Sequence, residues 1–371
     1  MKKNLAMILA CLLVVSLLAG CAGTVVIVGD SCTCPTGSHT ETTPNGNTNE
    51  TTKPTEGNND NVTAGAVKTG LSVFTSVKDS TSATADAEGS IKYDITIAAV
   101  TVDANGVITA CAIDSVPATV MINATGAITS DLTAEILTKN ELGENYGMVA
   151  WGGAIAEWDA QVAALCDFAV GKTLDELKNG AIDETGFAPE GSDLATSATI
   201  YLGGYVGAIE AAVNNATDLG ASAGDELKLV TINTVGSSTA ATADKAGNAQ
   251  LDTTIAVVTA KDGVITSCVI DSVQAKIAFD TTGTITSDLT AAIPTKNELG
   301  ENYGMVAWGG AIAEWNEQAA SFASYVTGKT ADEVAGIAIT ETSKPADGSD
   351  LATSVTISIG DFMCLIIKAL G

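Results

Sequence analysis

Histidine and basic residues are scarce in this chain. The only histidine among the 371 residues is His39, which stands in a polar stretch without neighbours that could make it a catalyst. Lysine and arginine number 17 against 44 aspartates and glutamates, and the formal charge is −27. A field of that sign repels phosphates and anionic headgroups. Histidine-based catalysis, nucleic-acid binding and attraction to anionic lipid are therefore not expected.

A short apolar run opens the chain. Lys2 and Lys3 precede LAMILACLLVVSLLA, which is too short and too close to the terminus for a good spanning helix. The run ends in LAGC, which resembles the bacterial lipobox, whose Cys is diacylated and becomes the mature N-terminus. The resemblance implies a lipoprotein signal peptide over 1–20, a lipidated Cys21, and a lipid-anchored place on the extracytoplasmic face of the bacterial cell membrane. The alternative is an ordinary signal peptide with an incidental Cys21.

Residues 21–66, which begin with Cys21, are expected to form a disordered spacer. After a short apolar start, Thr, Asn, Gly, Pro and Glu dominate, and nothing there could build a core. A flexible coil of about 45 residues spans roughly 35–40 Å. That length would lift the folded part of the protein off the lipid headgroups.

The eight cysteines do not form the pattern of a disulfide framework. Cys11 would leave with the signal peptide, Cys21 would carry lipid, and Cys32 and Cys34 lie in the spacer. The remaining cysteines are Cys111, Cys166, Cys268 and Cys364. Only Cys111 and Cys268 occupy equivalent positions of the repeat described below, so buried, unpaired thiols are expected. No cysteine spacing resembles a zinc site, and no metal site is predicted.

The rest of the chain repeats itself. TKNELGENYGMVAWGGAIAEW occurs unchanged at 138–158 and at 295–315, an offset of 157. A copy of about 150 residues is a normal domain size. The sequence therefore predicts two tandem homologous domains, 67–218 and 219–371, which are called the first and second repeat below.

Each repeat is predicted to be α+β, with an antiparallel sheet packed against helices. In the first repeat, alternating apolar residues over 92–102, 107–116 and 118–126 predict an antiparallel meander. A helix follows, on which the apolar stripe consists of Ile155, Trp158, Val162, Leu165, Phe168 and Ala169. Thr173 and Glu176 have the spacing of a capping box for the next helix. Helices are also predicted over 205–216 and 361–371.

A hydroxyl-rich octet follows in both repeats, within EGSDLATSATI (190–200) and DGSDLATSVTI (347–357). Its polar members are Asp193, Thr196, Ser197 and Thr199, and their equivalents Asp350, Thr353, Ser354 and Thr356. Hydroxyls just ahead of a helix can donate to the oxygens of a phosphate. The same residues are also common as plain helix caps or in an edge strand.

The octet resembles the Asp-x-x-Ser/Thr-Gly-Ala-Thr-x-Ser/Thr pattern of the FMN-binding domain family. In that family the phosphate of FMN is joined to the hydroxyl of the last Thr before x. The resemblance implies covalent FMN on Thr199 and Thr356, attached by a flavin transferase that uses FAD and magnesium. Ser197 and Ser354 stand where Gly is usual, and Tyr201 replaces the closing Ser/Thr that Ser358 retains.

A wider resemblance covers nearly the whole mature chain. The lipobox, the polar spacer, the two repeats and TKNELGENYGM together resemble the flavinylated electron-transfer lipoproteins of Gram-positive bacteria. The resemblance implies an electron carrier, rather than a self-contained enzyme, that takes electrons from a membrane quinol system. Extracellular acceptors such as ferric iron would receive them. The identical stretch could form a wall for the flavin ring, with these candidate packing groups: Tyr146, Met148, Trp151, Tyr303, Met305 and Trp308.

Two other functions fit the same residues. A surface binding or adhesion lipoprotein could carry Thr-rich strands in tandem. A receptor could bind FMN or a relative reversibly.

Overall fold

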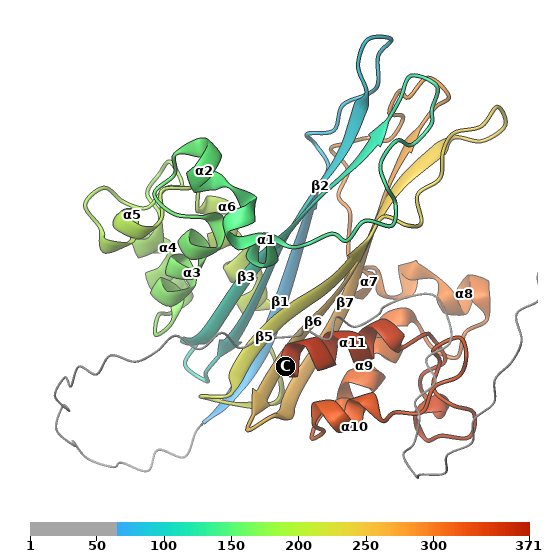
Figure 1. Cartoon of the computed structure of the whole chain (residues 1–371). Coiled ribbons are helices and arrows are strands. Elements are labelled where there is room, and N and C mark those ends of the chain that lie inside the picture. Colours follow the sequence, from blue (N-terminus) through green and yellow to red (C-terminus); the bar gives the residue numbers. More distant parts are fainter. Residues whose placement is uncertain (1–64) are drawn as a thin grey trace, which may run out of the picture. The chain divides into compact units, whose positions relative to one another are not determined.

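The computed structural model describes residues 65–371 (Figure 1). The predicted signal peptide, Cys21, Cys32, Cys34 and His39 lie outside the described residues. Across 65–371, no helix combines the length and the apolar character needed to cross a membrane.

The first repeat contributes a sheet of four antiparallel strands. They are β1 (Ala66–Ser76), β2 (Gly89–Val102), β3 (Ile108–Ile122) and β4 (Thr217–Ser222), in the order β3-β2-β1-β4. The predicted boundary between the repeats falls inside β4, which pairs with β1. The first residues of the second repeat therefore complete this sheet.

The second repeat contributes a three-stranded antiparallel sheet. It consists of β5 (Glu226–Thr234), β6 (Gly247–Lys261) and β7 (Val264–Phe279), in the order β5-β6-β7. The predicted α+β class with antiparallel sheets is confirmed. Strands β1, β4 and β5 were not predicted from the apolar periodicity.

The predicted meander is wrong in one respect. The segments 107–116 and 118–126 form one strand, β3, which pairs with β2 from Ile108 to Ile122. Pro117 lies within it and cannot donate a hydrogen bond, but β3 is an edge strand of its sheet, where a missing N–H costs little. In the second repeat, β7 is likewise continuous, with Gln274 in place of the proline.

Helices follow each hairpin. In the first repeat they are α1 (Lys139–Leu142), α2 (Met148–Gly152), α3 (Trp158–Ala169), α4 (Leu174–Ala181), α5 (Asp193–Ser197) and α6 (Gly203–Asn214), with the 3-10 turn η1 (Gly143–Tyr146). In the second repeat they are α7 (Lys296–Leu299), α8 (Met305–Gly309), α9 (Trp315–Val326), α10 (Ala331–Ala335) and α11 (Gly360–Leu370), with η2 (Gly300–Tyr303) and η3 (Leu351–Thr353).

Local signals in the sequence predicted four of these helices, α3, α4, α6 and α11. The capping box of Thr173 and Glu176 starts α4, and α6 and α11 cover the predicted C-terminal helices. The apolar stripe of α3 is buried at Trp158, Val162 and Leu165. Ile155 does not belong to it: this residue is 56% exposed, because α3 begins only after Glu157.

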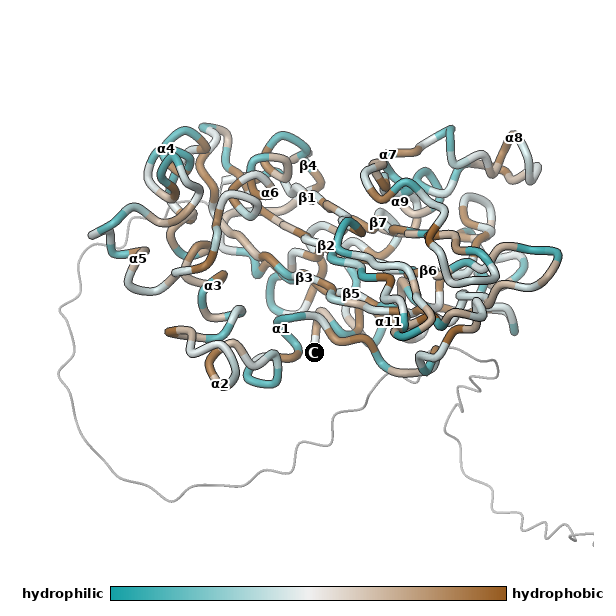
Figure 2. Tube along the Cα trace, turned by 90° about the horizontal axis from the view of Figure 1, so that it is seen from above, coloured by the Kyte–Doolittle hydropathy of each residue, from teal (hydrophilic) through white to brown (hydrophobic). Residues whose placement is uncertain are grey.

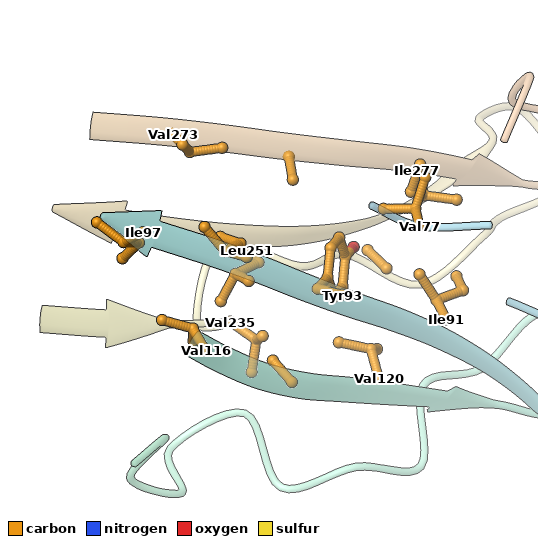
Figure 3. Close-up of a cluster of buried hydrophobic side chains, with 14 of the residues drawn as sticks. Val77, Ile91, Tyr93, Ile97, Val116, Val120, Val235, Leu251, Val273 and Ile277 are labelled. Atoms are coloured by element: carbon orange, nitrogen blue, oxygen red, sulfur yellow. The ribbon is translucent and has the colours of Figure 1, made fainter. Parts of the chain in front are cut away.

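The two sheets share one apolar cluster (Figure 3). Tyr93 and Ile97 of β2 pack in it together with Leu251 of β6 and Val273 of β7. The strands of the first repeat thus bury side chains against those of the second. A second cluster packs α3 and α6 on the first sheet, and a third packs α9 and α11 on the second sheet.

Strand β2 is buried on both faces. Ile95, Ile97 and Ala99 belong to the cluster between the sheets, whereas Ala98 and Val100 belong to the cluster under the helices. Successive side chains of a strand point to opposite faces, so one run of small and β-branched residues serves both layers. Figure 2 shows the hydrophobic stretches along the strands and the hydrophilic loops around α4 and α5.

Polar contacts also join the repeats. Lys368 of α11 pairs with Glu141 of α1, and the hydroxyls of Thr69 and Ser267 lie 2.8 Å apart. Within 65–371, no disulfide joins the cysteines at 111, 166, 268 and 364. Cys166 and Cys268 are buried, and Cys111 and Cys364 are half-buried.

Leu251→Ala tests the shared cluster. Leu251 is fully buried, so its truncation should lower the free energy of unfolding by about 2–5 kcal/mol. Because β2 packs in the same cluster, hydrogen exchange measured by mass spectrometry should lose protection in peptides of both β6 and β2. Leu177→Ala, in the helix cluster of the first repeat, is the control and should leave β6 protected. Unchanged protection of β2 in Leu251→Ala would show that the sheets do not depend on each other.

Candidate functional site

The first half of the octet forms a short helix of its own. In α5, the Ser192 hydroxyl accepts from the N–H of Ala195 at 3.2 Å, and Thr196 donates its hydroxyl to the carbonyl of Asp193 at 2.7 Å. Thr353 donates in the same way to Asp350 at 2.7 Å. These threonine hydroxyls therefore serve the local helix, and the carboxylates of Asp193 and Asp350 are exposed.

Thr199 and Thr356 stand apart from that pattern. In the first repeat, the carboxamide oxygen of Gln161 accepts from the N–H of Thr199 at 2.8 Å and from its hydroxyl at 3.3 Å. In the second repeat, Gln318 accepts from the N–H of Thr356 at 2.7 Å and from its hydroxyl at 3.2 Å. Each predicted attachment residue therefore meets a fully buried glutamine from α3 or α9.

The amide nitrogen of each glutamine fixes the orientation of its side chain. The amide nitrogen of Gln161 donates to the carbonyl of Ala156 at 2.8 Å, and that of Gln318 donates to Ala313 at 2.8 Å. The oxygen of Gln161 also accepts from the N–H of Ile200 at 3.2 Å. The threonine hydroxyl donates its proton toward the protein, and its lone pairs remain available to a group that approaches from solvent.

A pocket of about 670 Å³ lies beside Thr199. Ile200 and Tyr201, which follow Thr199 directly, line it together with Tyr146, Met148 and Trp158. Its volume is within the usual range for cofactor sites, about 300–1,000 Å³. The structure therefore brings two of the predicted packing groups, Tyr146 and Met148, to the same pocket as the end of the octet.

A buried lysine forms part of this pocket. Lys139 is only 7% exposed, and its ammonium lies 5.3 Å from the ring centre of Tyr146 and 5.1 Å from that of Trp158. Asp94 is its carboxylate partner at 3.9 Å. Contacts with aromatic faces compensate part of the cost of burying an ammonium group. The pocket is thus aromatic with one buried positive charge.

Tyr205 completes the aromatic wall. Its hydroxyl accepts from the indole N–H of Trp158 at 2.8 Å, and the two rings meet edge to face at 5.8 Å. Burial raises the pKa of Tyr205 above its ordinary value. The phenol therefore stays neutral at physiological pH and can take part in hydrogen bonds only.

The single-turn helix α1 holds Lys139 in place. Thr138 and Glu141 form a reciprocal capping box around it. The carboxylate of Asp114, on β3, accepts from the N–H of Asn140 at 3.2 Å, and the Asn140 side chain donates to the carbonyl of Ile113 at 2.9 Å. The segment is fastened to the sheet at its start, so the lysine has a fixed position.

The second repeat has the same arrangement around Lys296. Its ammonium lies 5.1 Å from the ring centre of Tyr303 and 4.8 Å from that of Trp315. Burial lowers the pKa of Lys296, and the carboxylate of Asp252 acts against this. Phe362 occupies the position of Tyr205 and packs edge to face on Trp315 at 5.7 Å. Tyr303 and Met305 pack against the cluster of this repeat.

The structure does not bring Trp151 into the pocket lining. Trp151 is 89% exposed and Trp308 is 90% exposed. Trp151 lies on α2, over Gly147, where a Cβ atom would overlap its indole. Gly147 also has a positive φ of 82°, which glycine adopts without strain.

The two glutamines, Tyr205, the buried Lys139 and the half-buried Lys296 were not predicted from the sequence. Gln161 carried a usable signal: it is a polar residue on the apolar face of α3, and Gln318 repeats it at the offset of 157. The neighbouring core positions differ, with Leu165 against Phe322. Lys139 had no such signal, because a lysine at a helix start is ordinarily solvated.

Among residues 65–371, no group of three or more His, Cys, Asp and Glu side chains is placed to hold a metal ion. Comparisons with protein-family models, curated proteins and solved structures found no match to this chain. The function proposed below therefore depends on the residues themselves.

Gln161→Met tests the glutamine contact. The substitution keeps the side-chain volume but leaves the N–H groups of Thr199 and Ile200 without their acceptor, so we expect a loss of about 2–4 kcal/mol in the free energy of unfolding. Gln318→Met is the matched comparison and should destabilise the protein less. Of the backbone N–H groups within 65–371, only that of Thr356 donates to the Gln318 side chain, whereas two donate to Gln161. Wild-type stability of Gln161→Met in denaturant unfolding would contradict the assigned contact.

Asp271 predicts a pH dependence of stability. Burial raises the pKa of this carboxyl, the equivalent of Asp114, to about 6. The folded state therefore favours the protonated carboxyl. The contribution of Asp271 to the free energy of unfolding is fully present below the unfolded-state pKa of about 3.9 and is lost as pH rises through about 6, a change of roughly 3 kcal/mol. Asp271→Asn should therefore gain stability relative to the wild type between pH 4 and pH 7.

Asp280→Asn is the control for this prediction. The Thr282 hydroxyl lowers the pKa of the exposed Asp280, so its contribution is present above the unfolded pKa and is lost as pH falls. Asp280→Asn should therefore lose stability relative to the wild type as pH rises, the opposite of Asp271→Asn. Urea unfolding at several pH values measures both, and a pH-independent difference for Asp271→Asn would contradict the assignment.

Proposed function

We propose that this protein is a lipid-anchored extracytoplasmic electron carrier with FMN bound covalently to Thr199 and Thr356. The observation that carries the proposal is the pairing of each of these threonines with a buried glutamine, in both repeats. No other hydroxyl of the octet has such a partner among the described residues. The residues beside Thr199 then offer an aromatic pocket of suitable size.

The pocket residues fit a flavin. Tyr146 and Tyr201 line the pocket with accessible rings, and Tyr201 is 55% exposed. The ammonium of Lys139 lies 5.3 Å from the ring centre of Tyr146, where it would favour a ring that gains negative charge. The flavin, when bound, would supply the one- and two-electron chemistry that these side chains lack. A covalent link would suit a cofactor that is otherwise lost from the cell surface.

Attachment requires a partner enzyme. Joining a threonine hydroxyl to the FMN half of FAD forms one P–O bond, breaks the pyrophosphate bond, and releases AMP and the hydroxyl proton. We propose that a magnesium-dependent flavin transferase carries out this step. The exposed side chain of Thr199 and the partly exposed side chain of Thr356 are accessible to such an enzyme. A membrane quinol-linked donor and an extracellular acceptor such as ferric iron would complete the electron path.

The same proposal includes two tandem homologous domains. The capping boxes of α1 and α7, and the lysines that follow them, agree between the repeats. The cluster between the sheets means that the domains would be joined tightly rather than tethered. Two flavins would then be carried in one rigid arrangement.

Threonine substitutions test the proposal. The chain, made together with a flavin transferase, should give a band with flavin fluorescence on a denaturing gel. Thr199→Val and Thr356→Val should each remove about half of this fluorescence, and the double variant should be dark, because valine keeps the shape but has no hydroxyl. Thr196→Val and Thr353→Val are matched controls and should keep the full signal.

The other outcomes identify the alternative functions. A dark band with flavin released into solution would indicate a reversible flavin-binding receptor. A preparation without any flavin would indicate a binding or adhesion protein. Full fluorescence in the double variant would refute the attachment residues.

A further inference from the structure

The two predicted flavin sites differ in charge. In the first repeat, the charged residues lining the pocket are Lys78, Lys139 and Asp94, which together carry a net charge of +1. Lys78 is exposed, so water screens much of its charge, whereas Lys139 is buried. This site is therefore neutral to positive.

The equivalent positions of the second repeat are Gly236, Lys296 and Asp252. The strand pairings support this alignment, since Phe74 faces Thr96 and Ile232 faces Thr254. A further difference lies at the start of the C-terminal helix of each repeat, where Asp361 replaces Gly204, a lining residue. One lysine against two aspartates gives this site a net charge of −1.

The carboxylates of the second repeat act on the charge of Lys296. Asp252, Asp271 and Asp361 all act on the Lys296 ammonium and oppose the effect of its burial. Asp252 also acts on the phenol of Tyr303. Asp271 has its counterpart Asp114 in the first repeat, so it does not distinguish the sites. Lys276 of β7 opposes these carboxylates, and its effect on Lys296 is smaller than those of Asp252 and Asp271 but larger than that of Asp361. Lys276 is exposed, as Lys78 is in the first repeat, so water screens much of its charge, whereas Asp361 is half-buried.

We propose that the two sites hold their flavins at different reduction potentials, with the first-repeat site the more easily reduced. The inference rests on the proposed function. Reduction adds negative charge to a flavin ring, and a charge of +1 around the ring favours this change whereas a charge of −1 opposes it. Electrons shared between the two sites would therefore reside mainly in the first repeat.

Two aligned positions differ in charge, Lys78 against Gly236 and Gly204 against Asp361, and the second pair is the one exchanged by substitution here. Gly204 tolerates a side chain, because a Cβ atom there meets no atom within 4 Å and its φ is not positive. It lies in the first turn of α6, where an aspartate is favourable for the helix. The charge can therefore be exchanged between the sites with little change in structure.

The experiment uses full-length chain that carries one flavin at a time. Thr356→Val leaves the first site loaded and Thr199→Val leaves the second, after co-expression with a flavin transferase. Each protein is reduced without oxygen in the presence of a reference dye, and flavin absorbance reports the reduced fraction. At the potential where the first site is half reduced, the second should still be mostly oxidised.

Two charge variants complete the test. Gly204→Asp should make the first site harder to reduce, and Asp361→Asn should make the second site easier to reduce. Asp332→Asn on α10, outside the aligned lining positions, is the control and should change neither potential. Either shift in the stated direction supports the proposal if the other variant folds poorly, and a folded variant whose potential is unchanged contradicts it.

The failures are distinguishable. Absence of covalent flavin from both single-site proteins would refute the proposed function. Loaded proteins with equal potentials, or with the second site reduced first, would overturn this inference and leave the proposed function intact.

Discussion

The burial of β2 and β6 on both of their faces is the constraint on which the rest of the structure depends. Ile97 of β2 and Leu251 of β6 both belong to the cluster between the sheets. Other side chains of the same two strands belong to the clusters under the helices. A strand that is covered on both sides cannot shift by one residue without exchanging the two layers. The register of both hairpins is therefore held firmly, and so is everything attached to them.

The sheets fix the positions of the residues at the site. Asp114 of β3 holds the start of α1, and α1 places Lys139 between two rings. Trp158 starts α3, and α3 also carries Gln161, which holds Thr199. Lys139 thus precedes α3 in the chain and Thr199 follows it. A buried polar side chain holds the position of each.

The two repeats show which features vary independently. The stretch 138–158 is identical to 295–315, and the glutamine contact is made with nearly the same distances in both. The residues that surround the lysines are not identical: Tyr205 and Gly204 correspond to Phe362 and Asp361. The framework that places the hydroxyl is thus shared, whereas the electrostatic environment is specific to each repeat.

The sequence by itself determined the features that depend on interactions over a few residues. The capping box at Thr173, the apolar stripe of α3 and the α+β class follow from local spacing, because each contact joins residues within one or two turns or along one strand. Thr199 and Thr356 were singled out by a resemblance in the octet, which the sequence displays directly.

Only the tertiary structure decided which distant residues meet. Gln161 lies 38 positions before Thr199, and nothing in local spacing indicates that they form a hydrogen bond. The same holds for the burial of Lys139 and for the cluster that joins the two sheets, since both result from packing of surfaces far apart in the chain. The continuity of β3 through Pro117 also depends on tertiary structure, because a proline is tolerated there only if its strand lies at the edge of the sheet.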